Sequence, residues 1–166
     1  MNKTLIVVDM QNDFIDMALG TKEAVAIVPN VKAKIDAYAA AGHRIIYTRD
    51  THEENYLDTP EGKKLPVPHC IRGTKGWQIA DGLYIDGCKI IDKPNFGWPN
   101  WKDEALADVE LIGLCTDICV VSNALIIKAA FPEASVKVDA ACCAGVTPES
   151  HDAALLTMRM CQIDIL

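Results

Sequence analysis

A carboxylate, a second acidic residue, a lysine and a cysteine each follow a short apolar run of this sequence. These residues are Asp9, Asp50, Lys93 and Cys119. A thiol becomes a nucleophile when a nearby ammonium or a helix N-terminus favours the thiolate, or when a base removes its proton. A carboxylate within reach can take that proton and return it to a leaving amine. The four residue types therefore predict acyl transfer through a cysteine, provided that the fold brings them together.

Each residue also has a simpler structural interpretation. An aspartate at a strand end is more often a turn or capping residue, and a lone lysine there is usually solvated. A lone cysteine is commonly a small buried apolar residue. The placement of all four after successive apolar runs favours the functional interpretation.

Alternating strands and helices are predicted to position these residues. Short β-branched runs are typical of buried strands, and apolar residues at helical spacing lie between them. Gly42 is expected to end one helix, and Thr147 to cap another with Pro148 at its first position. The alternation favours parallel strands, whose carboxyl ends form the edge where ligands bind. The expected strands are Thr4–Asp9, Arg44–Thr48, Lys89–Asp92, Val109–Leu114, Ser135–Val138 and Gln162–Leu166, and the expected helices are Ile27–Ala41, Cys119–Phe131 and Pro148–Met160.

The composition is that of an ordinary globular protein, and we expect a single domain over residues 1–166. Half of the residues are hydrophobic and the formal net charge is −7, which argues against a nucleic-acid or anionic-membrane partner. No apolar run is long enough to cross a bilayer, and the stretch before Asp9 is too short for a signal peptide. We therefore expect a cytoplasmic protein. The seven cysteines are an odd number, and disulfides are not expected in a reducing compartment.

Histidines and acidic residues in one segment form a candidate metal site. Asp50 and His52 stand at alternate positions and can point to the same side of an extended chain. His69 follows a polar, proline-bearing stretch from Asp50 to Pro68, which we expect to be irregular and functional. Two histidines and a carboxylate suit Zn²⁺, Fe²⁺ or Mn²⁺. Solvated loop histidines are the alternative.

Three motifs together resemble those of the isochorismatase-like cysteine hydrolases. They are DMQNDF at residues 9–14, the lysine at 93, and GLCTDICV at residues 113–120, in the order and at the spacing of that family. The resemblance covers essentially the whole chain. It implies a triad of Asp9 as base and then acid, Lys93 as electrostatic partner and Cys119 as nucleophile.

The resemblance also implies details of the substrate pocket and of the fold. The backbone N–H groups of Cys115 and Cys119 would form an oxyanion hole, with a cis peptide between Leu114 and Cys115. Phe14 would stack on the substrate. The implied fold has three layers, α/β/α, around a six-stranded, mainly parallel sheet in the order 3-2-1-4-5-6.

Within this superfamily the metal-containing nicotinamidases are the most similar branch. Their Asp-x-His pair and later histidine correspond to Asp50, His52 and His69, which implies a divalent metal, with zinc first and iron or manganese as alternatives. Glu61 is preferred as a fourth ligand over Asp58 or Glu54. The implied partner is a small amide, namely nicotinamide, which places the reaction in NAD metabolism. The alternative is a related amidase for another small amide or carbamoyl compound, and self-association stays open.

Some features depart from the nicotinamidase pattern or leave alternatives. Pro66 stands where many nicotinamidases have a tryptophan, and either Trp98 or Trp101 could supply an aromatic wall or be structural. Cys115 is an alternative nucleophile. A thiol-redox protein is a third class, but Cys115 and Cys119 do not form a Cys-x-x-Cys pair. The neighbouring cysteines at 142 and 143 are interpreted as packing residues.

Overall fold

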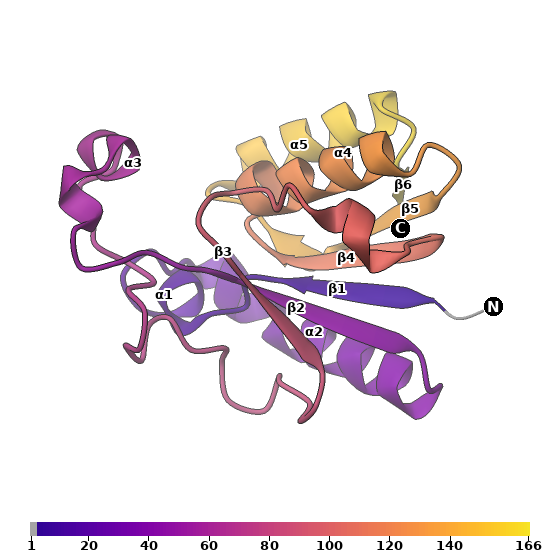
Figure 1. The fold of residues 1–166 in the computed structure, drawn as a ribbon, viewed down its shortest axis with the longest axis horizontal. Coiled ribbons are helices and arrows are strands. Elements are labelled where there is room, and N and C mark those ends of the chain that lie inside the picture. The colour runs from indigo at the N-terminus through magenta and orange to yellow at the C-terminus, as the bar shows by residue number, and fades with distance from the viewer. Residues whose placement is uncertain (1–2) are drawn as a thin grey trace.

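The computed structural model describes residues 3–166 as a twisted sheet with helices on both faces (Figure 1). The order of the strands is β3-β2-β1-β4-β5-β6 and every pair is parallel, which confirms the predicted α/β fold and its strand order. The strands are β1 (Thr4–Val8), β2 (Arg44–Asp50), β3 (Lys89–Lys93), β4 (Asp108–Leu114), β5 (Ser135–Ala144) and β6 (Asp164–Ile165).

Helices cover both faces of the sheet, with α2 on one side and α4 and α5 on the other (Figure 1). The central strand shows why its sequence is apolar throughout. Leu5 and Val7 pack in the cluster that includes α2, whereas Ile6 and Val8 pack in the cluster that includes α4 and α5. The helices are α1 (Asn12–Ile15), α2 (Lys22–Ala40), α3 (Pro60–Lys64), α4 (Val121–Ala130) and α5 (Pro148–Met160).

The predicted C-terminus of α2 and the predicted N-terminus of α5 are confirmed, and the predicted N-terminus of α2 is corrected. Gly42 follows α2 with a φ of 68°, as a helix-ending glycine does. Thr147 caps α5, accepting a hydrogen bond from the Ser150 N–H, and Pro148 is its first residue. Helix α2 begins at Lys22 rather than at the predicted Ile27, because Thr21 caps it there. Its first residues offer only two alanines and an exposed valine, Val25, as apolar side chains, so the spacing of larger apolar residues did not mark them.

The segment from Asp50 to Pro68 contains helical structure that was not predicted. A 3₁₀ turn spans Tyr56–Asp58, and α3 follows it directly. Thr59 caps α3 by accepting a hydrogen bond from the Gly62 N–H at 3.0 Å. A Cβ at Gly62 would lie 2.0 Å from the Tyr56 carbonyl oxygen, so only glycine fits. This tight pair of turns fixes where the side chains of α3 point.

The helix after β4 does not begin at Cys119 as predicted. A π-helical turn spans Thr116–Val120, and α4 begins only at Val121. Gly113 permits the approach to β1, since it has a φ of 121° and a Cβ there would lie 2.1 Å from the Val8 carbonyl oxygen. The Leu114–Cys115 peptide is cis, as the family resemblance implied. No helix in residues 3–166 is both long and apolar enough to cross a membrane.

Candidate active site

Asp9, Lys93 and Cys119 meet at the carboxyl ends of β1, β3 and β4. The Lys93 Nζ lies 2.6 Å from Oδ2 of Asp9 and 3.5 Å from Sγ of Cys119. Asp9 and Lys93 have no exposed surface, and Cys119 is 4% exposed. The structure thus brings together the three side chains of the predicted triad and removes them from bulk water.

A threonine that the sequence analysis missed orients the carboxylate of Asp9. Thr48 is fully buried in β2, and its hydroxyl donates to Oδ1 of Asp9 at 2.6 Å. Asp9 itself has a φ of 48°, a conformation that non-glycine residues rarely adopt. The one available signal was the position of Thr48 near the carboxyl end of a predicted strand beside Asp9.

Burial and the neighbouring charges shift the pKa values of all three side chains of the predicted triad. Burial raises the pKa of the Cys119 thiol well above its ordinary value, Asp9 raises it further, and Lys93 opposes both. Burial also raises the pKa of Asp9, against the effect of Lys93. Burial alone would lower the pKa of Lys93, but the Asp9 carboxylate raises it. Burial thus favours the neutral thiol of Cys119, which lies beside a carboxylate and an ammonium.

Cys119 is the cysteine that meets the lysine of the triad. Cys115 lies in the same turn, and burial raises the pKa of its thiol to about 12. Cys142 and Cys143 are buried in the two apolar clusters, in line with a packing role. All seven cysteines of the chain lie in the described residues and all are free.

Asp50, His52, Glu61 and His69 form a second cluster, and their ligand atoms all lie within 4.8 Å of one another. Nε2 of His52 lies 3.0 Å from Oδ2 of Asp50 and 3.6 Å from Oε1 of Glu61. Nε2 of His69 lies 3.5 and 4.0 Å from the same two oxygens. Glu61, the preferred fourth ligand, is in the cluster, whereas the alternatives Glu54 and Asp58 are exposed and outside it.

The cluster fits a tetrahedral divalent metal. Ligand atoms bonded to such an ion at about 2.0–2.2 Å would lie about 3.3–3.6 Å apart. The four separations given above, 3.0–4.0 Å, bracket this range. Nδ1 of His69 lies 2.8 Å from the Val67 carbonyl oxygen, which leaves Nε2 to face the cluster. Oδ1 of Asp50 is buried and has no hydrogen-bond partner among the described residues. Burial alone would raise the pKa of Asp50, but hydrogen bonds with His52 and His69 hold it well below its usual range.

Two residues of the DMQNDF motif hold the backbone that carries this cluster. The Gln11 amide nitrogen donates to the carbonyl oxygens of Asp50 and Trp77, each at 2.8 Å, and its oxygen accepts from the Asp50 N–H at 2.7 Å. Oδ2 of Asp13 accepts from the Cys70 N–H at 2.7 Å. Cys70 has a φ of 47° rather than an extended backbone. Neither contact was predicted, because the partners are far apart in the sequence.

An aromatic side chain packs against both histidines of the cluster. The ring of Tyr56 is centred 4.7 Å from that of His52 and 5.0 Å from that of His69. Its hydroxyl donates to the Leu65 carbonyl oxygen at 2.8 Å. Tyr56 was not predicted as a site residue, and its place in an unpredicted 3₁₀ turn explains why.

One pocket has both Cys119 and residues of the metal-ligand cluster in its wall. Phe14 lies in its wall, as the resemblance implied, with its ring centred 5.5 Å from that of His69. Neither Trp98 nor Trp101 lines the pocket. Trp101 is buried in the core and donates to Asn123, and Trp98 is partly buried and packs against the same cluster. Phe96, from the same segment of the chain as the two tryptophans, lines the pocket instead. The pocket is lined by Phe14, Leu19, Asp50, Glu61, Leu65, His69, Phe96, Cys115, Ile118 and Cys119.

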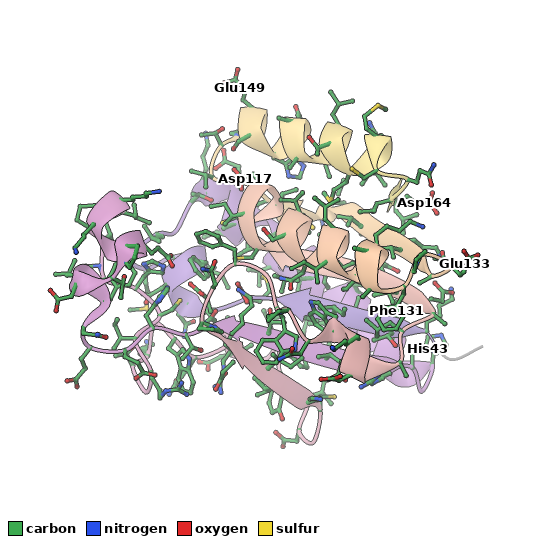
Figure 2. The ribbon with its side chains drawn as sticks, turned by 45° about the horizontal axis from the view of Figure 1, so that its top comes forward. His43, Asp117, Phe131, Glu133, Glu149 and Asp164 are labelled. Atoms are coloured by element: carbon green, nitrogen blue, oxygen red, sulfur yellow. The ribbon has the colours of Figure 1, made fainter. Side chains whose placement is uncertain are left out.

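The turn that carries Cys119 is held against α5 and the segment before it. Both carboxylate oxygens of Asp117 lie 3.2 Å from the Val146 nitrogen, and Figure 2 shows Asp117 near the start of α5. The Thr116 hydroxyl lies 2.7 Å from Nδ1 of His151 in α5. These contacts fix the turn that carries Cys119.

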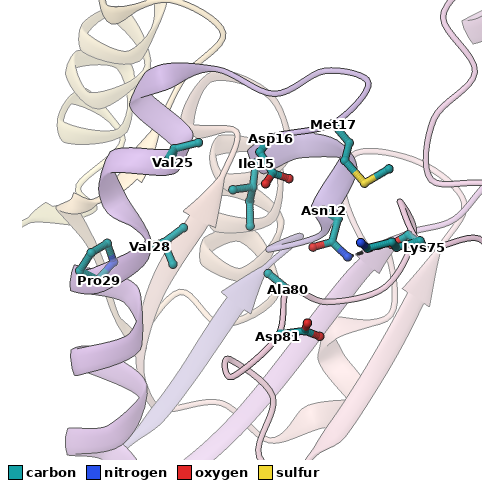
Figure 3. Close-up of a pocket in the computed structure, with 10 residues that line it drawn as sticks. All are labelled: Asn12, Ile15, Asp16, Met17, Val25, Val28, Pro29, Lys75, Ala80 and Asp81. Atoms are coloured by element: carbon teal, nitrogen blue, oxygen red, sulfur yellow. Dashed lines mark hydrogen bonds between the residues drawn. The ribbon is translucent and has the colours of Figure 1, made fainter.

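A shallower groove lies away from this chemistry, between α1, α2 and the loop before β3 (Figure 3). Asn12 crosses it and donates to the Lys75 carbonyl oxygen at 2.8 Å. Its charged side chains, Asp16, Lys75 and Asp81, are exposed and do not converge on a common point (Figure 3). The described residues that line this groove include no cluster of buried reactive side chains like that of Asp9, Lys93 and Cys119.

The isochorismatase-domain family model matches residues 3–166, so the chain belongs to the isochorismatase family. The chain is 26% identical over 184 residues to the nicotinamidase/pyrazinamidase of Mycobacterium tuberculosis, with 99% of this chain and 98% of the relative covered. It is 29% identical over 178 residues to an Arabidopsis thaliana protein described as a probable inactive nicotinamidase, with 95% and 88% covered.

The solved structures agree with this assignment. The crystal structure of the pyrazinamidase of Pyrococcus horikoshii in complex with zinc has a TM-score of 0.85 to this chain at 26% identity. The similarity covers 100% of this chain and 99% of that one. The relatives found by sequence and by structure thus include nicotinamidases and pyrazinamidases.

Proposed function

We propose that this protein is a metal-dependent nicotinamidase that converts nicotinamide and water to nicotinate and ammonia through a thioester on Cys119. The observation that carries the proposal is the single pocket with Cys119 and the ligands Asp50, Glu61 and His69 in its wall. Its family and its nicotinamidase relatives support an amidohydrolase acting on a C–N bond.

In the first half-reaction Sγ of Cys119 attacks the carboxamide carbon as its proton passes to the Asp9 carboxylate. The C–N bond then breaks, and Asp9 returns the proton to the leaving nitrogen, which departs as ammonia. Because burial raises the pKa of Asp9, the group is suited both to accept and to release a proton. Lys93 stabilises the anionic sulfur as the attack proceeds.

In the second half-reaction water attacks the thioester carbon while Asp9 takes its proton. The C–S bond breaks, the proton of Asp9 returns to the sulfur of Cys119, and the carboxylic acid formed loses its proton to solvent as nicotinate. The N–H groups of Cys115 and Cys119 would donate to the oxyanion in both halves of the reaction. Phe14 would pack on the pyridine ring.

Asp50, His52, Glu61 and His69 would hold the divalent metal, with zinc as the first choice and iron or manganese as alternatives. When bound, the metal supplies a Lewis-acidic centre that a ring nitrogen can coordinate, so that the carboxamide is oriented toward Cys119. The activity would belong to NAD metabolism, and the cytoplasmic location and single domain expected from the sequence are part of the proposal.

The test is ammonia release from nicotinamide and from a small aliphatic amide, with the protein as purified, after chelation and after zinc is restored. Zinc content is measured in each sample. We expect chelation to reduce nicotinamide turnover much more than turnover of the aliphatic amide. Turnover of nicotinamide that does not change when zinc is removed would exclude the proposed role of the metal. Cleavage of other amides or carbamoyl compounds, but not of nicotinamide, would favour the related amidase.

A further inference from the structure

An apolar chamber adjoins the pocket that contains Cys119. Its volume is about 300 Å³, compared with about 50 Å³ for the inner pocket between Cys119 and the metal-ligand cluster. None of the described residues that line the chamber is charged. They are Phe14, Leu19, Thr21, Ala24, Leu65, Leu114, Cys115, Ile118, Gly145 and Val146.

The chamber and the inner pocket are neighbours because they share walls. The shared side chains are Phe14, Leu19, Leu65, Cys115 and Ile118. A carboxamide held at Cys119 therefore has the chamber beside it, on the side of the oxyanion turn. The inner pocket is smaller than the chamber, so a substrate that fills only the inner pocket leaves the chamber empty.

The walls define the chemistry of a group that would fit. Of the two polar side chains among them, the Thr21 hydroxyl already accepts a hydrogen bond from the Ala24 N–H at 3.0 Å. Burial raises the pKa of the other, the Cys115 thiol, so it stays neutral. A charged or strongly polar group would lose hydration there without a compensating partner, whereas a hydrocarbon group would gain by burial.

We propose that this chamber binds an apolar substituent on the acyl part of a primary carboxamide substrate. The proposal rests on the amide hydrolysis proposed above and specifies the substrate class. The acyl side follows from Asp9, which must face the leaving nitrogen to protonate it. Asp9 has no exposed surface and lies outside the walls of both hollows. A substituent on nitrogen would point into that packed interior, whereas one on the acyl group can enter the chamber.

The experiment compares nicotinamide with two series of derivatives that carry methyl, ethyl or propyl groups. In one series the group is on each free ring carbon in turn, and in the other it is on the amide nitrogen. We expect kcat/KM to rise by about fourfold per buried methylene for at least one ring position. We expect the nitrogen series to be poorer than nicotinamide at every chain length. Failure of every ring position to exceed nicotinamide would overturn the proposal.

Two variants fill the chamber from different sides. Ala24→Leu places a larger side chain at a buried wall, and Val146→Phe does so at the exposed rim, where folding tolerates it better. Both are expected to abolish the preference for the propyl derivative, measured as the ratio of its kcat/KM to that of nicotinamide. Ala26→Leu makes the same exchange at an exposed position of α2 outside the chamber and should keep the wild-type ratio. If the ratio stays at the wild-type value in both filled variants, the chamber is not the binding site.

A binding measurement separates this proposal from the nicotinamidase proposal. Each amide is also tested for protection of Cys119 against iodoacetamide, which requires occupancy of the site and no turnover. Stronger protection by the ring-alkylated amides supports the chamber even if nicotinamide itself is not hydrolysed. Nicotinamide turnover with no added protection by the alkyl groups leaves the nicotinamidase proposal standing and rejects the chamber.

Discussion

The Nζ of Lys93 lies 3.9 Å from Oδ1 of Asp50, and both side chains are buried. The same ammonium lies 2.6 Å from Oδ2 of Asp9, so one positive charge lies between the Asp9 carboxylate and a candidate metal ligand. Asp9 is the nearer partner. The charge balance of the triad therefore rests mainly on the Asp9–Lys93 pair and not on the metal-ligand cluster.

Replacement of Lys93 by methionine is expected to raise the apparent pKa of the Cys119 thiol, because a neutral side chain cannot stabilise the thiolate. Lys93 lowers that pKa in the native protein, so its removal moves the pH profile of alkylation by iodoacetamide to higher pH. The control is Lys89→Met, which removes an exposed lysine on the same strand. An unchanged alkylation profile in Lys93→Met would rule out this electrostatic role, even if hydrolysis were lost.

Replacement of Cys119 by alanine is expected to reduce kcat by about 10⁴-fold or more while the fold is kept, as for other nucleophile deletions. Cys115→Ala tests the alternative nucleophile, because it removes that thiol and leaves the backbone N–H in place. We expect it to retain at least about a tenth of the activity. Circular dichroism checks folding. Strong residual turnover in Cys119→Ala with loss in Cys115→Ala would reassign the nucleophile.

The residues at the strand ends could be predicted from the sequence because their placement follows from local patterns. A buried strand shows as a β-branched run, and parallel strands bring their carboxyl ends to one edge. The start of α5 at Thr147-Pro148-Glu149 was recognised as a capped helix. The same three residue types stand at Thr59-Pro60-Glu61 and start α3. That helix was missed because it is short and lacks an apolar period.

The supporting contacts could not be predicted because they join residues distant in the chain. The Gln11–Asp50 bonds span 39 positions and the Asp13–Cys70 bond spans 57. The raised pKa of Cys119 has a similar origin, since complete burial follows from tertiary packing and outweighs the nearby ammonium. Short motifs thus indicated which residues to consider as catalytic candidates, whereas the fold determines their burial and orientation.

Replacement of Glu61 by glutamine is expected to weaken zinc binding by about 10–100-fold, as loss of a metal-site contact does. Its Oε1 lies 3.6 Å from Nε2 of His52 and 4.0 Å from that of His69. Zinc affinity is measured by competition with a chromophoric chelator. The control is Glu54→Gln, an exposed residue outside the cluster. Equal zinc affinities in the two variants would exclude Glu61 as a ligand, and Cys119 alkylation should be the same in both.

Replacement of Gln11 by alanine is expected to reduce both stability and zinc affinity. The Gln11 side chain is fully buried and makes three hydrogen bonds to the backbone of Asp50 and Trp77. Each partner left unpaired in the interior costs about 1–3 kcal/mol, so the urea midpoint should fall clearly. Because the Asp50 backbone would lose its anchor, zinc should bind about 10–100-fold more weakly. Asn12→Ala is the matched control, since it removes one exposed side-chain bond to the Lys75 carbonyl oxygen. A Gln11→Ala protein that is less stable but binds zinc with wild-type affinity would show that Gln11 supports the fold without positioning Asp50.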